Sequence, residues 1–77
     1  MLFKLTSFHA TTDGGVKPQR PLFIRASTWF NARRVIAAAL EVPSDDVILT
    51  LCKDSVVPEG ADLMDERFPD QRTLQVA

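Results

Sequence analysis

Short alternations of apolar and polar residues predict three strands. The first is "LFKLTSFH" at residues 2–9, and the second is "PLFIRA" at 21–26, which begins with a proline where a missing N–H is tolerated. Between them, "DGG" at residues 13–15 is a turn signal, because glycine tolerates positive φ. These two strands should therefore form a hairpin with a long loop. The third strand is "DDVILTLCK" at residues 45–53.

A helix is predicted between the second and third strands, over residues 28–41. Ser27 or Thr28 can cap its first turn with a hydroxyl, but no Glu or Gln follows three residues later, so the capping box is absent. Pro43 ends the helix, because the residue before a proline avoids the α conformation.

One side of this helix is apolar on the 3.6-residue wheel, with Trp29, Ile36 and Leu40 together. We expect Trp29 to be the central core residue of that side. Arg33 falls near the same apolar centre and has two interpretations. It is an anion ligand or a buried partner for an acid, or its stem covers apolar surface while its guanidinium reaches water or stacks on Trp29. The second interpretation is favoured, because no phosphate-binding loop accompanies the arginine.

The second and third strands are apolar on both faces. In the third strand, Val47, Leu49 and Leu51 share one face, and Ile48, Thr50 and Cys52 share the other. A single helix covers only one face, so a second cover is expected. The sequence predicts an α+β fold: a small ββαβ module with a hairpin and one helix packed on a three-stranded sheet. The third strand should lie beside the first and parallel to the second, since the helix is a crossover connection.

The chain is predicted to divide into a ββαβ core at residues 1–54 and an acidic C-terminal arm at 55–77. Leu63, Met64 and Phe68 would form the apolar side of one helical turn in this arm. The final "RTLQVA" alternates and could add a short fourth strand. We expect the arm to pack on the core or on a partner chain.

Charge is distributed unevenly along the chain, although the formal net charge is only −1. Residues 1–40 hold six basic residues and one acid, a net +5, whereas residues 41–77 hold three basic residues and nine acids, a net −6. The halves either neutralise each other, within or between chains, or the basic half contacts nucleic acid. The candidate anion or nucleic-acid contacts are Lys17, Arg20, Arg25, Arg33 and Arg34.

Few residues carry catalytic or metal-binding chemistry. Cys52 and His9 are the single cysteine and histidine, too few for a disulfide or a Cys/His zinc site. No phosphate-binding glycine motif, calcium loop or distinctive carboxylate pair is present, so no catalytic residue, cofactor, metal or small-molecule substrate is predicted. No apolar run approaches the roughly 20 residues that span a membrane, and the first residues lack the apolar run of a signal peptide. A cytoplasmic location, or one within an intracellularly assembled particle, is expected.

These patterns favour a non-enzymatic small subunit or adaptor of a larger protein assembly, for example a component of a phage or other multi-subunit particle. It would bind a protein partner, or itself, through the second sheet face and the arm. The candidate partner-binding residues are Phe23, Ile48, Leu63, Met64 and Phe68. The alternative is a nucleic-acid-binding accessory or regulatory module that uses the basic hairpin and helix. The order of elements is shared by many small α+β proteins and does not decide between them.

Overall fold

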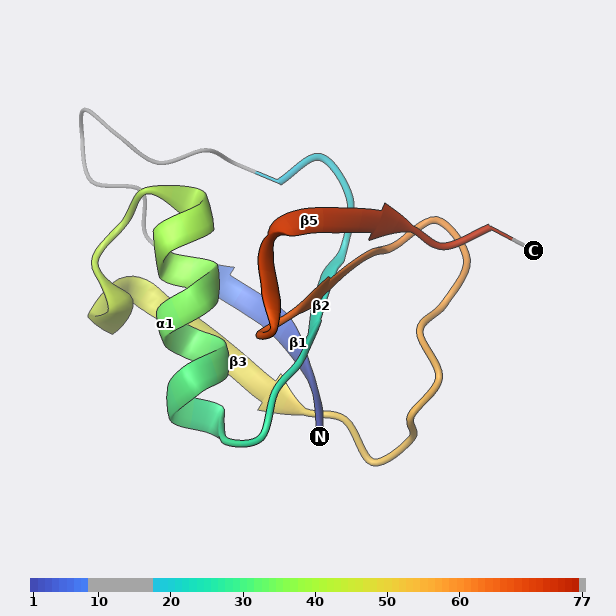
Figure 1. Ribbon diagram of the computed structural model, residues 1–77, viewed down its shortest axis with the longest axis horizontal. Helices are drawn as coiled ribbons and strands as arrows, with labels where there is room; N and C mark the ends of the chain where they lie inside the picture. The colour runs from blue at the N-terminus through green and yellow to red at the C-terminus, as the bar shows by residue number, and fades with distance from the viewer. Residues whose placement is uncertain (9–17, 77) are drawn as a thin grey trace.

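The computed structural model describes residues 1–8 and 18–76, and within them one α-helix packs on a five-stranded mixed sheet (Figure 1). The elements are β1 (Leu2–Phe8), β2 (Leu22–Arg25), α1 (Trp29–Leu40), the short 3-10 helix η1 (Ser44–Asp46), β3 (Val47–Leu51), β4 (Asp62–Asp65) and β5 (Phe68–Leu74). The predicted turn at residues 13–15 lies outside the described residues.

The strands lie in the order β3-β1-β2-β4-β5. β1 is antiparallel to both β2 and β3, so β2 and β3 are parallel to each other, and the predicted place of the third strand is confirmed. The α+β class is also confirmed, although the sheet has five strands instead of three. β4 pairs with β2 in parallel, and β5 returns antiparallel to β4. The division of the chain at residue 54 stays a prediction.

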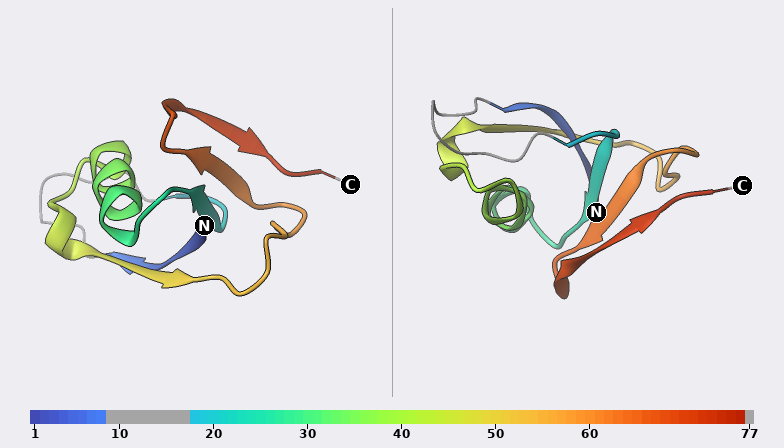
Figure 2. Two further views of the ribbon diagram at one scale, coloured as in Figure 1. Left: turned by 60° about the horizontal axis from the view of Figure 1, so that its bottom comes forward. Right: turned by 90° about the horizontal axis from the view of Figure 1, so that it is seen from above.

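The C-terminal part forms strands, and the predicted helical turn over Leu63, Met64 and Phe68 was wrong. Leu63 and Met64 lie on β4, and Phe68 begins β5. The predicted strand at "RTLQVA" overlaps the second half of β5. The sheet twists so strongly that β4 and β5 stand at a steep angle to β1 and β3 (Figure 2).

The ends of α1 follow the expected capping chemistry. The Thr28 hydroxyl accepts a hydrogen bond from the Asn31 backbone N–H at 3.1 Å. At the other end, Glu41 adopts a left-handed conformation with φ 58°, and its N–H returns to the carbonyls of Ala37 and Ala38. Pro43 follows two residues later, where the helix cannot continue.

The main core lies between α1 and the face of the sheet that the helix covers. Small alanines let the helix approach the strands closely, and Ile36 and Leu40 fill the space that remains. The fully buried large side chains of this core are Phe3, Leu22, Ile24, Ile36, Leu40, Met64 and Val47. Met64 comes from β4, so the C-terminal part contributes to the same core as the rest of the chain.

Trp29 does not lie in this core, and that prediction was wrong. It is 43% exposed, although Ile36 and Leu40 on the same side of the wheel are fully buried. A wheel gives the angle of a side chain but not its position along the axis, and Trp29 is the first residue of α1. The Arg33 guanidinium stacks on the indole, 4.6 Å from the ring centre, and lies 3.6 Å from an Asp45 carboxylate oxygen. The stacking on Trp29 is that of the second interpretation, and the acid that Arg33 contacts, Asp45, is itself exposed.

The other face of the sheet is covered at its centre by the chain itself. A second cluster of buried residues, Leu2, Phe23 and Ala61, gathers there with the partly buried Cys52, Val57 and Leu63. Ala61 and Val57 belong to the segment between β3 and β4, which supplies the cover that the two-sided strands require. Ile48 and Thr50 on the outer strand β3 stay exposed.

Candidate functional site

The turn between β4 and β5 is held by a carboxylate instead of a glycine. Its two residues are Glu66 and Arg67. The preceding Asp65 accepts a hydrogen bond from the Arg67 backbone N–H at 2.9 Å, as short acidic side chains do in turns. The same carboxylate accepts two more bonds from the Arg67 guanidinium, at 3.1 and 2.9 Å. These bonds from Arg67 lower the pKa of Asp65 from 3.8 to about 2 and raise the pKa of Arg67.

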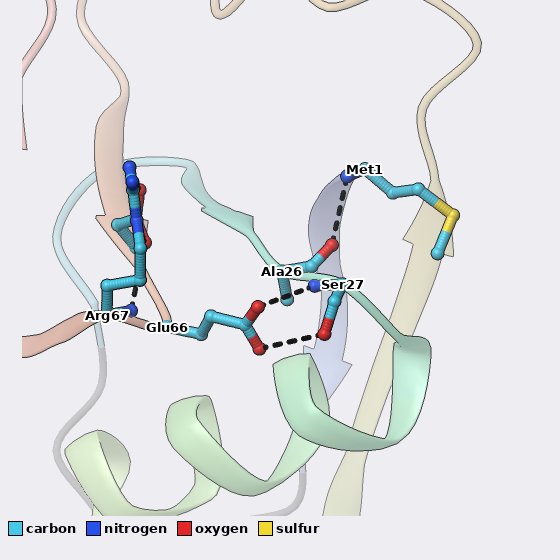
Figure 3. Close-up of polar contacts among 6 residues, drawn as sticks. Met1, Ala26, Ser27, Glu66 and Arg67 are labelled. Carbon is cyan, nitrogen blue, oxygen red and sulfur yellow. Dashed lines mark hydrogen bonds and ion pairs between the residues drawn. The ribbon is translucent and has the colours of Figure 1, made fainter.

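The turn is also attached to the start of the helix. Glu66 reaches across to Ser27, the residue before the helix cap (Figure 3). One carboxylate oxygen accepts from the Ser27 backbone N–H at 2.8 Å, and the other lies 3.4 Å from the Ser27 hydroxyl. The Glu66 backbone N–H donates to the Arg25 carbonyl at 3.0 Å. A carboxylate distant in sequence therefore binds the residue before the helix cap and lies near the positive end of the helix.

β5 is an edge strand in which all seven residues are exposed. It pairs with β4 only near its ends, through Phe68 opposite Asp65, and through Thr73 and Leu74 opposite Leu63 and Asp62. Between these pairs the register shifts, so residues 69–72 form an excursion opposite a single β4 residue. Two large apolar side chains are presented outward at either end of the strand, Phe68 at 52% and Leu74 at 43% exposure.

A groove runs between α1 and β5. Its apolar residues are Val35, Ala38 and Ala39 of the helix and Pro69 of the strand, and its charged residues are Arg34, Glu66 and Asp70. The apolar floor and mixed charges would suit a polypeptide segment better than a single small ion.

The five predicted partner-binding residues do not form one surface. Phe23 and Met64 are buried within the chain, on opposite faces of the sheet, so neither is available to a partner in this fold. Leu63 is partly buried beside Phe23. Ile48 and Phe68 are exposed, but they lie on β3 and β5, the two opposite edges of the sheet. Of the five predicted residues, the structure therefore leaves Ile48 and Phe68 exposed, at opposite edges of the sheet.

Three of the predicted anion contacts are engaged within the chain. Arg20 lies 3.9 Å from the carboxylate of Asp62, and Arg33 is bound as described above. Arg25 donates to the Ser55 backbone carbonyl at 3.2 Å. The carboxylates partly neutralise the charges of Arg20 and Arg33, and the Ser55 carbonyl orients the guanidinium of Arg25.

The predicted basic contacts that the structure describes do not share one surface. Arg34 is exposed beside the groove, and Lys17 lies outside the described residues. Arg25 alternates with the core residue Ile24 along β2, which places it on the face opposite the helix that carries Arg33 and Arg34. The described arginines are thus divided between the two sides of the sheet.

The single cysteine and the single histidine were the residues considered for catalytic or metal chemistry. Cys52 is a partly buried thiol against Leu2 and Phe23, and His9 lies outside the described residues. Residues 1–8 and 18–76 contain no group of three or more His, Cys, Asp or Glu side chains that could hold a metal ion. Every buried side-chain nitrogen or oxygen in these ranges has a hydrogen-bond partner.

Sequence reasoning missed the residues that fix the hairpin, Asp65, Glu66 and Arg67. The available signal was an Asp directly before a pair of charged residues between two short apolar runs, which is an Asp-initiated turn. The link from Glu66 to Ser27 has no local signal, because the two residues are 39 positions apart.

Comparisons with protein-family models, with curated proteins and with solved structures find no match to this chain. Among the described residues, no helix has the length and apolar character needed to cross a membrane. The surfaces that could bind a partner are therefore the two edges of the sheet and the groove beside β5.

Proposed function

We propose that this protein is a non-enzymatic small subunit or adaptor that binds a protein partner through β5 and the groove beside it. The observation that carries the proposal is β5 itself, a strand of seven residues with every residue exposed. A strand usually gains its place in a sheet by burying one face. β5 buries neither face within the chain, so a partner is the natural source of that burial.

The hairpin that presents β5 is preorganised for binding. Asp65 and Arg67 fix the turn, and Glu66 ties it to Ser27 at the start of α1. A surface that is already ordered loses less conformational entropy on binding. Phe68 and Leu74 then act as apolar anchors at the two ends of the strand.

The excursion at residues 69–72 and Pro69 within it interrupt the free edge of β5. A long added strand would meet this interruption, since proline has no N–H to donate. We therefore expect side chains, and not a continuous backbone ladder, to supply most of the contact. A partner segment with apolar residues for the groove floor and charges for Arg34, Glu66 and Asp70 matches this surface.

Nucleic-acid binding is the competing function, and the geometry supports it less. Arg20 and Arg33 already face acidic side chains, and Arg25 lies on the other side of the sheet from Arg33 and Arg34. A phosphate backbone is bound by basic groups that share one surface.

The proposal is tested by placing a photo-crosslinking amino acid at Phe68 or Leu74 in the native host cell. Val56 is the matched control, because it is an exposed apolar residue in the segment between β3 and β4. We expect one discrete crosslinked protein from the β5 positions and none from Val56. With that protein purified, Phe68→Ala should weaken binding at least tenfold, as expected for an anchor residue, whereas Val56→Ala should leave it unchanged.

Two results would overturn the proposal. The first is equal crosslinking from Phe68 and Val56. The second is binding of single-stranded RNA or DNA that falls steeply with salt and is lost in the Arg20→Glu/Arg25→Glu double variant, with no protein crosslinked to β5.

A further inference from the structure

The outer edge of β3 is the second open edge of the sheet, at the opposite end from β5 (Figure 1). No strand of the described residues pairs with β3 on that side. All five residues of β3 are paired with β1, and the bulge between these strands lies in β1, at Thr6. The β3 sequence "VILTL" contains no proline, glycine or charge. Within β3 itself, no proline, charge or bulge interrupts the edge.

The free backbone groups of this edge can be assigned from the pairing. The Cys52 N–H donates to the Leu2 carbonyl at 2.9 Å, toward β1. Donors and acceptors alternate along an antiparallel strand, so Thr50 also points toward β1. Leu49 and Leu51 therefore direct their N–H and C=O groups to the open side.

Apolar side chains lie on both sides of this edge. Ile48 is 47% exposed on the face away from the helix, and Leu51 is 54% exposed on the helix side. The N-terminal turn of α1 adds the exposed rings of Trp29 and Phe30. Arg33, one turn after Trp29, reaches Asp45 just before β3, so this side of the helix faces the β3 edge. Exposed aromatic and aliphatic residues gathered around unpaired backbone groups are typical of a protein-protein contact.

We infer that the β3 edge binds β3 of a second copy of this chain, antiparallel and about a two-fold axis at Leu49. The inference rests on the proposed role as a protein-binding module and names a second copy as one partner. Leu49 of each chain would exchange backbone hydrogen bonds with Leu49 of the other, and Leu51 would pair with Val47. One continuous sheet would run through both copies with both helices on the same side. The two β5 edges would then lie at the outer ends of the dimer, free for their own partner.

Charge selects the antiparallel arrangement. Asp45 and Asp46 precede β3, and Lys53 follows it with Asp54 directly after. In an antiparallel pair centred on Leu49, Lys53 of each copy lies opposite Asp45 of the second copy, while Asp54 lies opposite the uncharged Ser44. A parallel pair would place acids beside acids. The contact is isologous and closes at two copies.

A head-to-tail contact of β3 with β5 of the next copy fits less well. The free edge of β5 is interrupted by Pro69 and by the excursion at residues 69–72, so few β5 groups can face a regular strand. Of the two edge strands, β3 and β5, only β3 is paired along its whole length, so a second β3 could pair with it without interruption.

The test is sedimentation velocity of the pure chain over a wide concentration range, with Ile48→Lys and Leu51→Lys as edge variants and Phe68→Lys as the matched control. All three replace a side chain that is about half exposed, so the fold is expected to tolerate each change. The wild type should shift from monomer to dimer with concentration. Each β3 variant should lose the dimer at every concentration tested, because each places an unpaired lysine charge within the strand contact. Phe68→Lys should dimerise as the wild type does.

Other outcomes would overturn the inference. If Phe68→Lys also abolishes association, the contact is head-to-tail; if the wild type stays a monomer throughout, the second copy is not the partner. Amide hydrogen exchange provides a readout that needs no variant. The N–H groups of Leu49 and Leu51 should become protected as concentration rises, whereas that of Thr50 is protected at all concentrations. Neither measurement depends on crosslinking at Phe68, so this inference and the proposed function can fail separately.

Discussion

Asp65 shows how much of this structure depends on one side chain. Its carboxylate closes the turn through the Arg67 N–H, holds the Arg67 guanidinium, and thereby orients Arg67 over the ring of Phe68, at 5.6 Å. Phe68 is the anchor that we assign to partner binding. A turn without glycine or a left-handed residue is thus stabilised by a side-chain acceptor.

This arrangement predicts a local pH dependence. The pKa of Asp65 is lowered from 3.8 to about 2 in the folded chain, chiefly by the side-chain hydrogen bonds from Arg67. A lowered folded-state pKa means that the ionised carboxylate stabilises the hairpin above about pH 3.8, and that this contribution is lost as the pH falls toward 2. An NMR titration of the Asp65 carboxyl carbon should give a midpoint near 2. A midpoint at the ordinary value would show that the pair with Arg67 does not form.

Asp65→Asn is the control for this prediction. The asparagine oxygen can still accept from the Arg67 N–H, so the turn should persist, but the charge is removed. The protection of the Arg67 amide against hydrogen exchange, relative to an unstructured amide at the same pH, should fall in acid in the wild type. The variant should show no such fall.

Among the elements, the β4–β5 hairpin and α1 are connected by Glu66 and Ser27. The helix has no acidic residue in its first turn, so Glu66 is the carboxylate that lies near its positive end. This contact lets a hairpin with few buried residues hold a fixed position beside the helix and form one wall of the groove.

Glu66→Ala should therefore loosen the hairpin more than it unfolds the chain. Loss of a hydrogen bond to a charged group at a partly exposed site should lower the free energy of unfolding by about 1 kcal/mol. The Ser27 amide should exchange faster, while amides of the buried strands β1 and β2 stay protected. Glu59→Ala is the control, since Glu59 is exposed and makes no hydrogen bond or ion pair with the other described residues. Equal exchange at Ser27 in both variants would show that the link is not formed.

The elements differ in how well the sequence predicts them, and the reason is the range of the interactions. β1, β2, β3 and α1 follow from local periodicity and from the cap at Thr28, so their positions were predictable to within about two residues. β4 was missed because "DLMD" is too short to show a period, and Leu63, Met64 and Phe68 fit a helical turn equally well. Its pairing with β2 is non-local and leaves no signal in either segment.

The predicted contact residues were also only partly predictable from the sequence. Apolar character marked Phe68 and Ile48 as contact residues in advance, and both are exposed. The same criterion also selected Phe23 and Met64, which the chain buries itself, because apolarity does not reveal which surface the fold covers.

In the whole molecule, β4 and β5 have opposite roles although they form one hairpin. β4 lies between β2 and β5 and supplies Met64, which is only 1% exposed, to the main core. β5 lies outermost and buries no residue. The hairpin therefore joins a strand that contributes to the core to an exposed strand, for which we propose a role in binding.

Two truncations separate these roles. Deletion of residues 59–77 removes Ala61 and Met64 from the buried clusters, and the loss of Met64 alone should cost about 2–5 kcal/mol. Because total stability is about 5–15 kcal/mol for such domains, this truncation should unfold the chain or lower its melting temperature severely. Deletion of residues 68–77 removes no buried residue of the described chain and leaves the Asp65–Arg67 turn in place, so it should lower stability far less. Urea unfolding followed by circular dichroism measures both.

The shorter deletion is the decisive one, because it tests whether β5 is needed for folding or for partner binding. If β5 is a binding strand, the chain that ends at Arg67 folds, keeps the concentration-dependent dimer through β3, and loses the protein partner that crosslinks at Phe68. If instead this chain unfolds as completely as the one lacking residues 59–77, then the backbone bonds of β5 to β4 are needed for the fold. The full exposure of β5 would then reflect a structural edge and give no reason to assign it a partner.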